Sequence, residues 1–398
     1  MRKIRVFLLL LLLLILANCA STNLPPLTEV PSLDNLQEDE KSIWSLANEL
    51  EEKLNKNIDI FDDQDLENYI TDIANNISPP LIKSKIKFRV KIIRDSELNA
   101  FALPNGAIYI NLGLLAKIQN EDQLVTILGH EMAHVILRHS IIHFRDIKNK
   151  AAIYRVTSTC LLISGVNLSN LLNELGYVIT LASIQGYSRH LETEADTYGF
   201  NLMIKNGYNP YEGIKIYYQL LEETRDIKNN TPYFFSSHPR IENRIKNLEC
   251  LIKKDQNFIK TSSKKRNNFF IKMAKKAIIA ALKLDIDSNR YKSAERTIAL
   301  HSKVLGKETE FECLKGYLFY KKGDLEKSKQ ILTKILEIDR SKCNCLCCPQ
   351  KILGLIFYKK NKSISIPLFE EYLQFSINCS DHNFIKYLIR KFKNKIVR

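Results

Sequence analysis

Apolar residues recur at every third or fourth position between residues 39 and 76, which predicts two amphipathic helices before a Pro-Pro pair ends the pattern. Two short apolar runs at residues 87–93 and 107–111 have the length of strands, and a Pro-Asn-Gly turn signal at 104–106 lies between them. Long helical patterns then continue to about residue 252. This order predicts an α+β domain over residues 39–252, mostly helical with a small sheet.

The last third of the chain repeats itself. Residues 314–322 match residues 353–360 at a spacing of 38, and a second match has a spacing of 34, which is the tetratricopeptide period. We therefore expect all-α tetratricopeptide-like repeats over 277–398, with helical hairpins at 308–339 and 347–379. A generic helical bundle is the alternative. Repeats of this kind usually present a surface to a protein partner.

Three segments lie outside these two domains. Basic residues followed by an apolar run of twelve, Val6–Ala17, predict a secretory signal peptide over residues 1–18. Cys19 stands where this run ends, as in a bacterial lipobox, so it is the predicted lipid attachment site at the start of a tether over 19–38. An ordinary cleaved signal and an uncleaved anchor are the alternatives. Residues 253–276 are basic and form the predicted linker.

One predicted helix carries candidate chemistry. Asn120 and an acidic first turn open it, and it contains the sequence His-Glu-x-x-His at residues 130–134. Residues four apart lie on one helix face, so the imidazoles of His130 and His134 can share a zinc ion. Glu131 can then reach a zinc-bound water. A catalytic zinc site also needs a third protein ligand and an open position for that water.

Acidic residues downstream can complete the site. Glu192 and Asp196 are four apart in a second predicted helix and share one of its faces. Glu192 can therefore bind the metal while Asp196 accepts the outer N–H of a ligating histidine, an arrangement that fixes the histidine's tautomer. His190 and Glu194 are competing ligands for the third position.

Two other features lie between these motifs. His139 and His143 repeat the four-residue spacing, but no Glu follows His139, and we interpret them as solvated or interface histidines. The apolar stretch at residues 157–185 is interrupted by polar residues, which argues against a membrane span. It predicts an amphipathic helical hairpin, or alternatively buried core.

The motifs together resemble the zinc metalloprotease family that includes HtpX, the mitochondrial Oma proteases, the CAAX prenyl proteases and the periplasmic BepA. Further agreement comes from residues 99–106, from Ser188-Arg189, and from 237–239 with 244–245. The C-terminal repeats make the chain most similar to BepA-like members. The resemblance implies one Zn²⁺ per chain with the ligands His130, His134 and Glu192 and the general base Glu131.

The resemblance also implies roles for residues that spacing alone does not assign. His238 would lie near the metal, either as a fourth ligand in a closed state or as a donor to the transition-state oxyanion, and Arg244 would line the same side. Taken alone, His238 could equally be a surface histidine. Asn99 and Ala100 would border the substrate cleft. An exposed edge strand at 107–111 would pair with an extended substrate, which favours unfolded segments over a particular sequence.

Charge and cysteine content refine this picture. The net charge is −4 over residues 1–250 and +19 over 251–398, so the C-terminal part is expected to meet acidic surfaces. Nucleic acid is not an expected partner, because the signal sequence directs export and no nucleic-acid-binding signature is present. Besides Cys19 there are eight cysteines, four of them within residues 343–348. In an exported protein they favour disulfides, with a soft-metal site as the alternative.

These observations predict an exported, periplasmic, membrane-anchored zinc endopeptidase that acts on unfolded or misassembled envelope proteins. Its role would lie in protein quality control or outer-membrane protein assembly. The alternative is a periplasmic chaperone or scaffold that works through its repeats while His238 keeps the zinc site inhibited.

Overall fold

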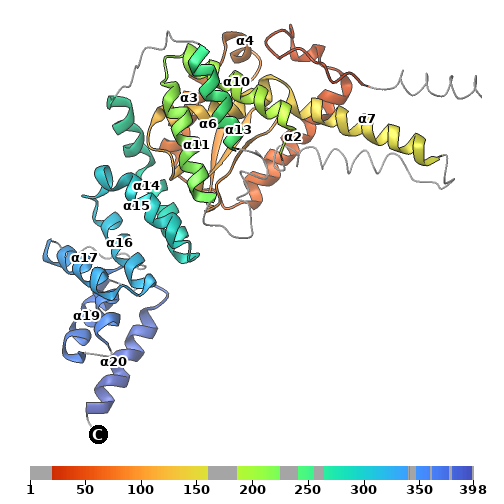
Figure 1. The fold of residues 1–398 in the computed structure, drawn as a ribbon. Coiled ribbons are helices and arrows are strands. Elements are labelled where there is room, and N and C mark those ends of the chain that lie inside the picture. The colour runs from red at the N-terminus through yellow and green to blue at the C-terminus, as the bar shows by residue number, and fades with distance from the viewer. Residues whose placement is uncertain are drawn as a thin grey trace, which may run out of the picture. The chain divides into compact units, whose positions relative to one another are not determined.

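The computed structural model describes residues 20–159, 186–224, 241–254, 264–338, 340, 347–358, 361–375 and 379–396. The chain divides into two compact units, residues 1–273 and 274–398 (Figure 1). The predicted signal peptide, Cys19, His238 and most of the 157–185 stretch lie outside the described residues. Within the described part of the chain, no helix is both long enough and apolar enough to cross a membrane.

A three-stranded sheet in the first unit has the order β1-β3-β2. Its strands are β1 (Arg89–Ile93), β2 (Ala100–Ala102) and β3 (Ala107–Asn111). β1 runs parallel to β3, whereas β2 runs antiparallel to it. The small sheet within a mostly helical unit agrees with the predicted α+β class.

The prediction that residues 107–111 form an edge strand is wrong, because β3 is the central strand of the sheet. The connection before it folds back as a tight turn, in which Leu103 N donates to Ala107 O at 2.8 Å and Gly106 N donates to Leu103 O at 2.9 Å. Gly106 adopts φ +87°, a conformation that glycine reaches without a steric penalty. The turn lets residues 100–102 pair with β3, so β2 occupies the edge.

Helices account for most of the first unit. Among the described residues, its elements besides the sheet are η1 (Leu33–Asn35), α2 (Glu38–Asn57), α3 (Gln64–Ile77), α4 (Pro80–Lys83), α5 (Leu112–Leu115), α6 (Glu121–Ile136), α7 (His139–Thr159), α10 (Arg189–Lys205), α11 (Pro210–Thr224) and α13 (Ile241–Lys254). The predicted helices between residues 39 and 76 are α2 and α3.

Helix α6 lies in the middle of this unit. Every residue from Glu121 to Ile136 is buried, and the helix packs against α3, α10, α11 and β2. Asn120 caps it as predicted, since its side-chain oxygen accepts a hydrogen bond from Gln123 N at 2.8 Å. Polar side chains on a helix buried all round must find partners in the interior.

Two glycines allow α6 and α10 to touch backbone to backbone. A Cβ atom placed on Gly199 would lie 2.6 Å from the carbonyl carbon of Gly129 and 2.7 Å from the amide nitrogen of His130. A Cβ atom on Gly129 would lie 3.0 Å from Gly199 O. No larger residue fits at Gly199 without separating the two helices.

The segment predicted as a tether packs on the domain instead. Leu27 is only 1% exposed, and its amide donates to the carbonyl of Ile136 at the end of α6, at 2.8 Å. Arg145 of α7 donates from Nη1 to Ser21 O at 3.0 Å. A segment outside the sheet and long helices gains such order when its backbone groups find partners, which the end of α6 and the side chain of Arg145 provide here. We call residues 20–36 the strap.

In the second unit, the secondary structure of the described residues is entirely helical. Its elements are α14 (Lys264–Asp287), which begins before the division between the units, α15 (Tyr291–Leu305), α16 (Thr309–Lys322), α17 (Leu325–Ile338), α18 (Pro349–Phe357), α19 (Lys362–Phe375) and α20 (His382–Ile396).

The pairs α16–α17 and α18–α19 repeat the same contacts. Ser328 Oγ donates to Gly316 O at 2.9 Å, and Ser365 Oγ donates to Gly354 O at 2.8 Å. In both pairs a side chain of the second helix packs so closely over the glycine that a Cβ atom would overlap it. The two pairs lie where hairpins were predicted, and their assignment to the tetratricopeptide class stays a prediction.

The cysteines of the second unit differ in state. Cys348 and Cys379 are disulfide-bonded, which confirms the preference for disulfides at these two positions. Cys313 and Cys347 are free and buried. Cys343 and Cys345 lie outside the described residues.

Replacing Gly199 by alanine tests the helix crossing. Alanine gains about 1 kcal/mol of helix propensity, but separating two packed backbones costs about 3 kcal/mol. We therefore expect a lower free energy of unfolding in urea and a lower midpoint. Asn201→Ala, at an exposed position of the same helix, is the control and should change the free energy by less than about 0.5 kcal/mol. Equal stability of both variants would contradict the assigned role of the crossing.

Candidate metal centre

Helices α6 and α10 bring three potential metal ligands together. Donor atoms of His130, His134 and Glu192 all lie within 4.8 Å of one another, and the three side chains are buried. His130 Nε2 is 3.1 Å from His134 Nε2, while oxygens of Glu192 lie 3.5 and 3.4 Å from these two nitrogens. Ligands bound tetrahedrally at ~2.0–2.1 Å from a metal are about 3.3 Å apart. The donor set therefore fits a divalent metal ion.

Nearby charges favour a cation at this position. Burial lowers the pKa of His130 and so does the charge of Arg244, but hydrogen bonds to Asp196 and Glu192 outweigh both and raise it to about 9. Buried carboxylates that draw a proton onto an imidazole also attract a metal ion, which then competes with that proton. We conclude that the electrostatic field of the pocket suits a metal ion.

Asp196 contacts His130, the first of the two histidines. Its Oδ1 lies 2.9 Å from His130 Nδ1, so the nitrogen that faces away from Glu192 meets a carboxylate. Burial raises the pKa of Asp196, yet the charge of Arg244 and the contact with His130 hold it below its ordinary value. Asp196 is therefore ionised and can fix the orientation and tautomer of His130.

Arg244 of α13 holds this aspartate in turn. Its Nε donates to Asp196 Oδ2 at 2.9 Å and its Nη2 donates to Oδ1 at 2.7 Å, a bidentate pair in the interior. Nη2 also donates to Tyr217 Oη at 2.7 Å, and the guanidinium lies 4.6 Å from the centre of the Tyr217 ring. Because Arg244 Nη1 is also 3.9 Å from Glu192, one cation balances both carboxylates.

The second histidine is held by a residue that we had interpreted differently. His139 is fully buried, not solvated, and its Nδ1 lies 2.9 Å from His134 Nδ1. Burial lowers the pKa of His139 to about 3, so the ring is neutral and can accept a hydrogen bond. When His134 Nε2 binds a metal, the proton of His134 is on Nδ1 and can be donated to His139.

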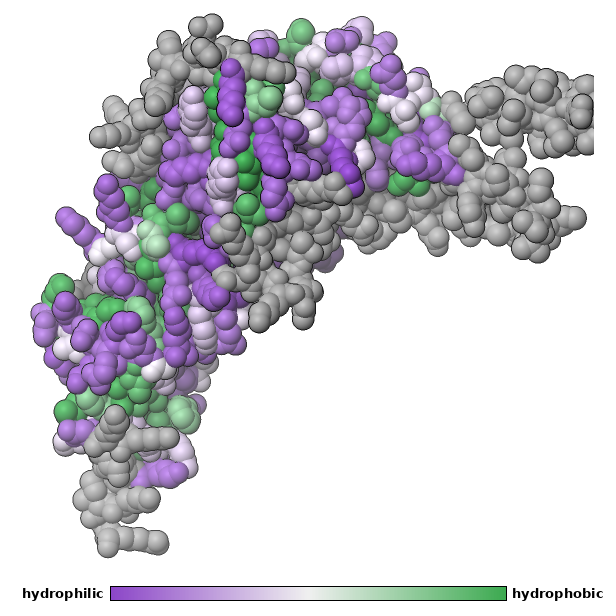
Figure 2. Space-filling model, viewed as in Figure 1, coloured by the Kyte–Doolittle hydropathy of each residue, from purple (hydrophilic) through white to green (hydrophobic). Residues whose placement is uncertain are grey.

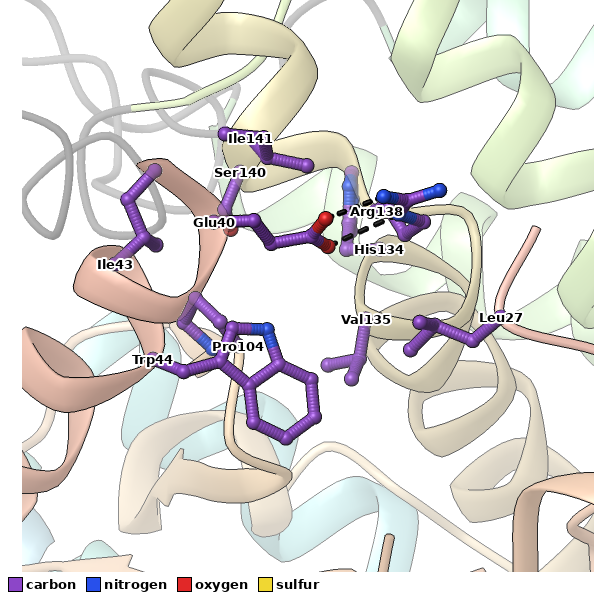
Figure 3. Close-up of a pocket in the computed structure, with 10 residues that line it drawn as sticks. All are labelled: Leu27, Glu40, Ile43, Trp44, Pro104, His134, Val135, Arg138, Ser140 and Ile141. Atoms are coloured by element: carbon purple, nitrogen blue, oxygen red, sulfur yellow. Dashed lines mark hydrogen bonds and ion pairs between the residues drawn. The ribbon is translucent and has the colours of Figure 1, made fainter. Parts of the chain in front are cut away.

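A sharp turn brings His139 back to α6. Arg138, directly after the helix, has φ +63°, which is rare for a residue with a Cβ atom. Its guanidinium makes two hydrogen bonds to Glu40 of α2 and donates to Pro25 O of the strap at 3.0 Å. Figure 3 shows this ion pair beside His134, with Trp44 and Pro104 lining the same small pocket. These partners stabilise the left-handed turn.

Tyr187 covers the other side of His134. The two rings stack with their centres 4.2 Å apart and an angle of 17° between their planes. The Tyr187 hydroxyl lies 2.9 Å from Ser140 Oγ, and this contact joins the segment before α10 to the start of α7. His134 is thus enclosed by Tyr187 and His139.

The remaining predicted site residues fall into three groups. Glu131 is 1% exposed and sits on α6 between the ligating histidines. Asn99 and Ala100 are buried at edge strand β2, where Asn99 O accepts a hydrogen bond from Asn111 N at 2.9 Å. His190 is excluded from the ligand cluster, because its side chain is 81% exposed and pairs loosely with Glu194 at 3.8 Å.

Sequence reasoning missed His139, Arg138, Tyr187 and Tyr217. Only the adjacency of Arg138 and His139 to the motif offered a signal. Spacing along a single helix could not reveal the turn that ends α6 and brings His139 against His134. Tyr187 and Tyr217 reach the site through packing of elements distant in sequence, for which no local pattern exists.

The contact between His139 and His134 can be tested by metal affinity. His139→Phe removes the acceptor while keeping an aromatic side chain of similar size, and we expect metal affinity to fall about 10- to 100-fold in a chelator competition titration. His190→Gln, a change of an exposed histidine on α10, is the control and should bind metal as the wild type does. Unchanged affinity of His139→Phe would show that the contact does not support the ligand.

Comparisons with known proteins agree with this arrangement. Residues 62–252 match Peptidase family M48. Mitochondrial metalloendopeptidase OMA1 of Schizosaccharomyces pombe is 29% identical over 182 residues, covering 46% of this chain and 51% of the relative. A putative beta-barrel assembly-enhancing protease of Vibrio cholerae is 30% identical over 200 residues, covering 48% and 40%. Metalloprotease YcaL of Escherichia coli is 30% identical over 158 residues, covering 40% and 59%.

The chain thus spans 40–59% of the length of these three relatives. The matched region of the family contains both helices that carry the metal ligands, as well as Asp196 and Arg244. Over residues 62–252 the chain is therefore similar to peptidase family M48, and the similarity includes the candidate metal ligands.

Proposed function

We propose that this protein is a zinc-dependent endopeptidase of the bacterial cell envelope that degrades misfolded or misassembled proteins. The observation that carries the proposal is the triangle of His130, His134 and Glu192 donor atoms, with Glu131 beside it on α6. Two imidazoles and one carboxylate are the ligand set of many catalytic zinc sites in proteases.

Each residue of the site has a task in this reaction. Bound zinc would polarise the scissile carbonyl and lower the pKa of a water toward ~7. Glu131 accepts the proton of the attacking water and passes it to the leaving amine. Asp196 keeps His130 in the ligating tautomer, and Arg244 offsets the negative charge of Asp196 and Glu192. His238, outside the described residues, is proposed to meet the oxyanion or to close the resting site.

The sheet suggests how a substrate would lie. β2 pairs with β3 on one side and forms the sheet edge, and α6 packs against it. We propose that an extended segment adds to this edge near Asn99 and Ala100, in place of the edge first expected at residues 107–111. Recognition of main-chain groups selects unfolded segments more than it selects sequences.

An envelope location rests on several observations. Two relatives are named beta-barrel assembly-enhancing proteases, and the predicted signal peptide directs export. The disulfide-bonded Cys348 and Cys379 are typical of an oxidising compartment. Lipid attachment at Cys19 would place the protein at a membrane, with the strap rather than a free tether between the lipid and the domain.

The second unit is proposed to bind a protein partner through tetratricopeptide-like repeats. Figure 2 shows apolar side chains among the hydrophilic surface of this unit. Ile338 is 86% exposed, and Phe375, Phe384 and Tyr387 are exposed as well. Large apolar side chains in contact with water mark interaction sites when they gather on one surface.

The activity is tested by removing the general base. Glu131→Gln is expected to retain one zinc ion per chain, measured by elemental analysis, and to degrade an unfolded substrate about 10²- to 10⁴-fold more slowly. Glu52→Gln, a change of an exposed carboxylate on α2, is the matched control and should degrade it at the wild-type rate.

Two results would decide against this function. If the protein binds no zinc, it is not a zinc peptidase, and its function would depend on the repeats. A protein that binds zinc yet cleaves nothing, with or without replacement of His238, would favour a scaffold.

A further inference from the structure

A cavity of about 280 Å³ opens beside the metal centre, between the first turns of α10 and of α13. Two residues of the centre, Glu192 and Arg244, form part of its wall. Whatever occupies the cavity is therefore next to the metal ligands. The mechanism described above makes no use of it.

The other described residues of the wall are polar or positively charged. Arg189 and Lys246 contribute cationic side chains, and Asn243, Asn247 and Thr193 contribute amide and hydroxyl groups. Both cationic residues are exposed, and in the described part of the chain neither side chain makes an ion pair. Many other surface cations of this unit have a carboxylate partner, as Lys150 has in Asp146 and Lys215 has in Glu212.

Glu192 is the sole carboxylate among the described residues of the wall, and its charge is already balanced. It lies 3.9 Å from Arg244 Nη1 and belongs to the metal-ligand triangle. The cavity thus presents two unbalanced positive charges to a ligand. Amide and hydroxyl groups around them can donate hydrogen bonds to oxygens.

We infer that this cavity binds the carboxylate of an Asp or Glu residue of the substrate, at a position close to the scissile bond. The inference rests on the proposed peptidase function and adds a preference to it: segments that carry an acidic residue bind better than neutral ones. The guanidinium of an arginine and the ammonium of a lysine both form charge-assisted hydrogen bonds with a carboxylate. A cavity of this size holds one side chain and water.

The size of the effect follows from the exposure of the two cations. Exposed ion pairs contribute little individually, so two of them should tighten binding by about fivefold at low salt. The preference should shrink as salt is added, because screening acts strongly on exposed charges.

The test measures peptide binding without cleavage. The zinc-loaded full chain carrying Glu131→Gln is titrated into fluorescent ten-residue peptides, acetylated and amidated at their ends, and anisotropy is recorded. One peptide contains a central Asp and its partner contains Asn at that position. A third peptide has the Asn sequence with a free C-terminal carboxylate. It shows whether the cavity binds the carboxylate of an acidic side chain or that of a chain end.

We expect the Asp peptide to bind about fivefold more tightly than both Asn peptides at low salt. Adding Arg189→Gln and Lys246→Gln should abolish this difference and leave the affinity for the Asn peptides unchanged. Lys53→Gln with Lys56→Gln, a matched loss of two exposed charges on α2, should preserve the difference. Equal binding of all three peptides, or tighter binding of the free carboxylate alone, would overturn the inference.

Failure of the inference differs from failure of the proposed function. If the wild type degrades protein but the Asp preference is absent, the peptidase stands and the acidic subsite does not. If the preference is present and lost with Arg189 and Lys246, but the wild type cleaves no peptide, the cavity is a binding site in a protein that is not a peptidase.

Discussion

The contact between Gly129 and Gly199 is the constraint on which the site depends. Two helices approach so closely only where both lack a side chain, and at this point the amide of His130 faces the Cα of Gly199. The residues that must meet lie within about two turns of the crossing: His130 and His134 follow Gly129 on α6, and Glu192 and Asp196 precede Gly199 on α10. The crossing therefore sets the distances of 3.4 and 3.5 Å between Glu192 and the histidines.

The second constraint is the balance of charge in a site that water barely reaches. Glu192 and Asp196 are buried, and buried carboxylates need cations near them. Arg244 supplies one permanent charge, and a metal ion would supply the other. Next to this pair of carboxylates, His139 is neutral because burial outweighs every charge around it. One site thus contains an ionised support for His130 and a neutral support for His134.

The turn at Arg138 links these supports to the rest of the unit. Glu40 and the strap both hold its guanidinium, so residues near the start of the chain contribute to the position of His134. The strap was predicted to be part of a tether, and apart from the short helix η1 it contains no helix or strand. Composition does not reveal that Leu27 finds a buried place against the end of α6.

The sequence by itself determined what is local: the helices α2, α3 and α6, the cap at Asn120, the strands β1 and β3 within the runs 87–93 and 107–111, and the shared face of His130 with His134. Helix periodicity and capping act over a few residues, so they can be read along the chain. Only the tertiary structure decided that β3 is central, that His139 supports His134, and that Arg189 and Lys246 share a cavity beside Glu192. Those facts depend on which distant segments pack together, and packing has no short-range signature in sequence.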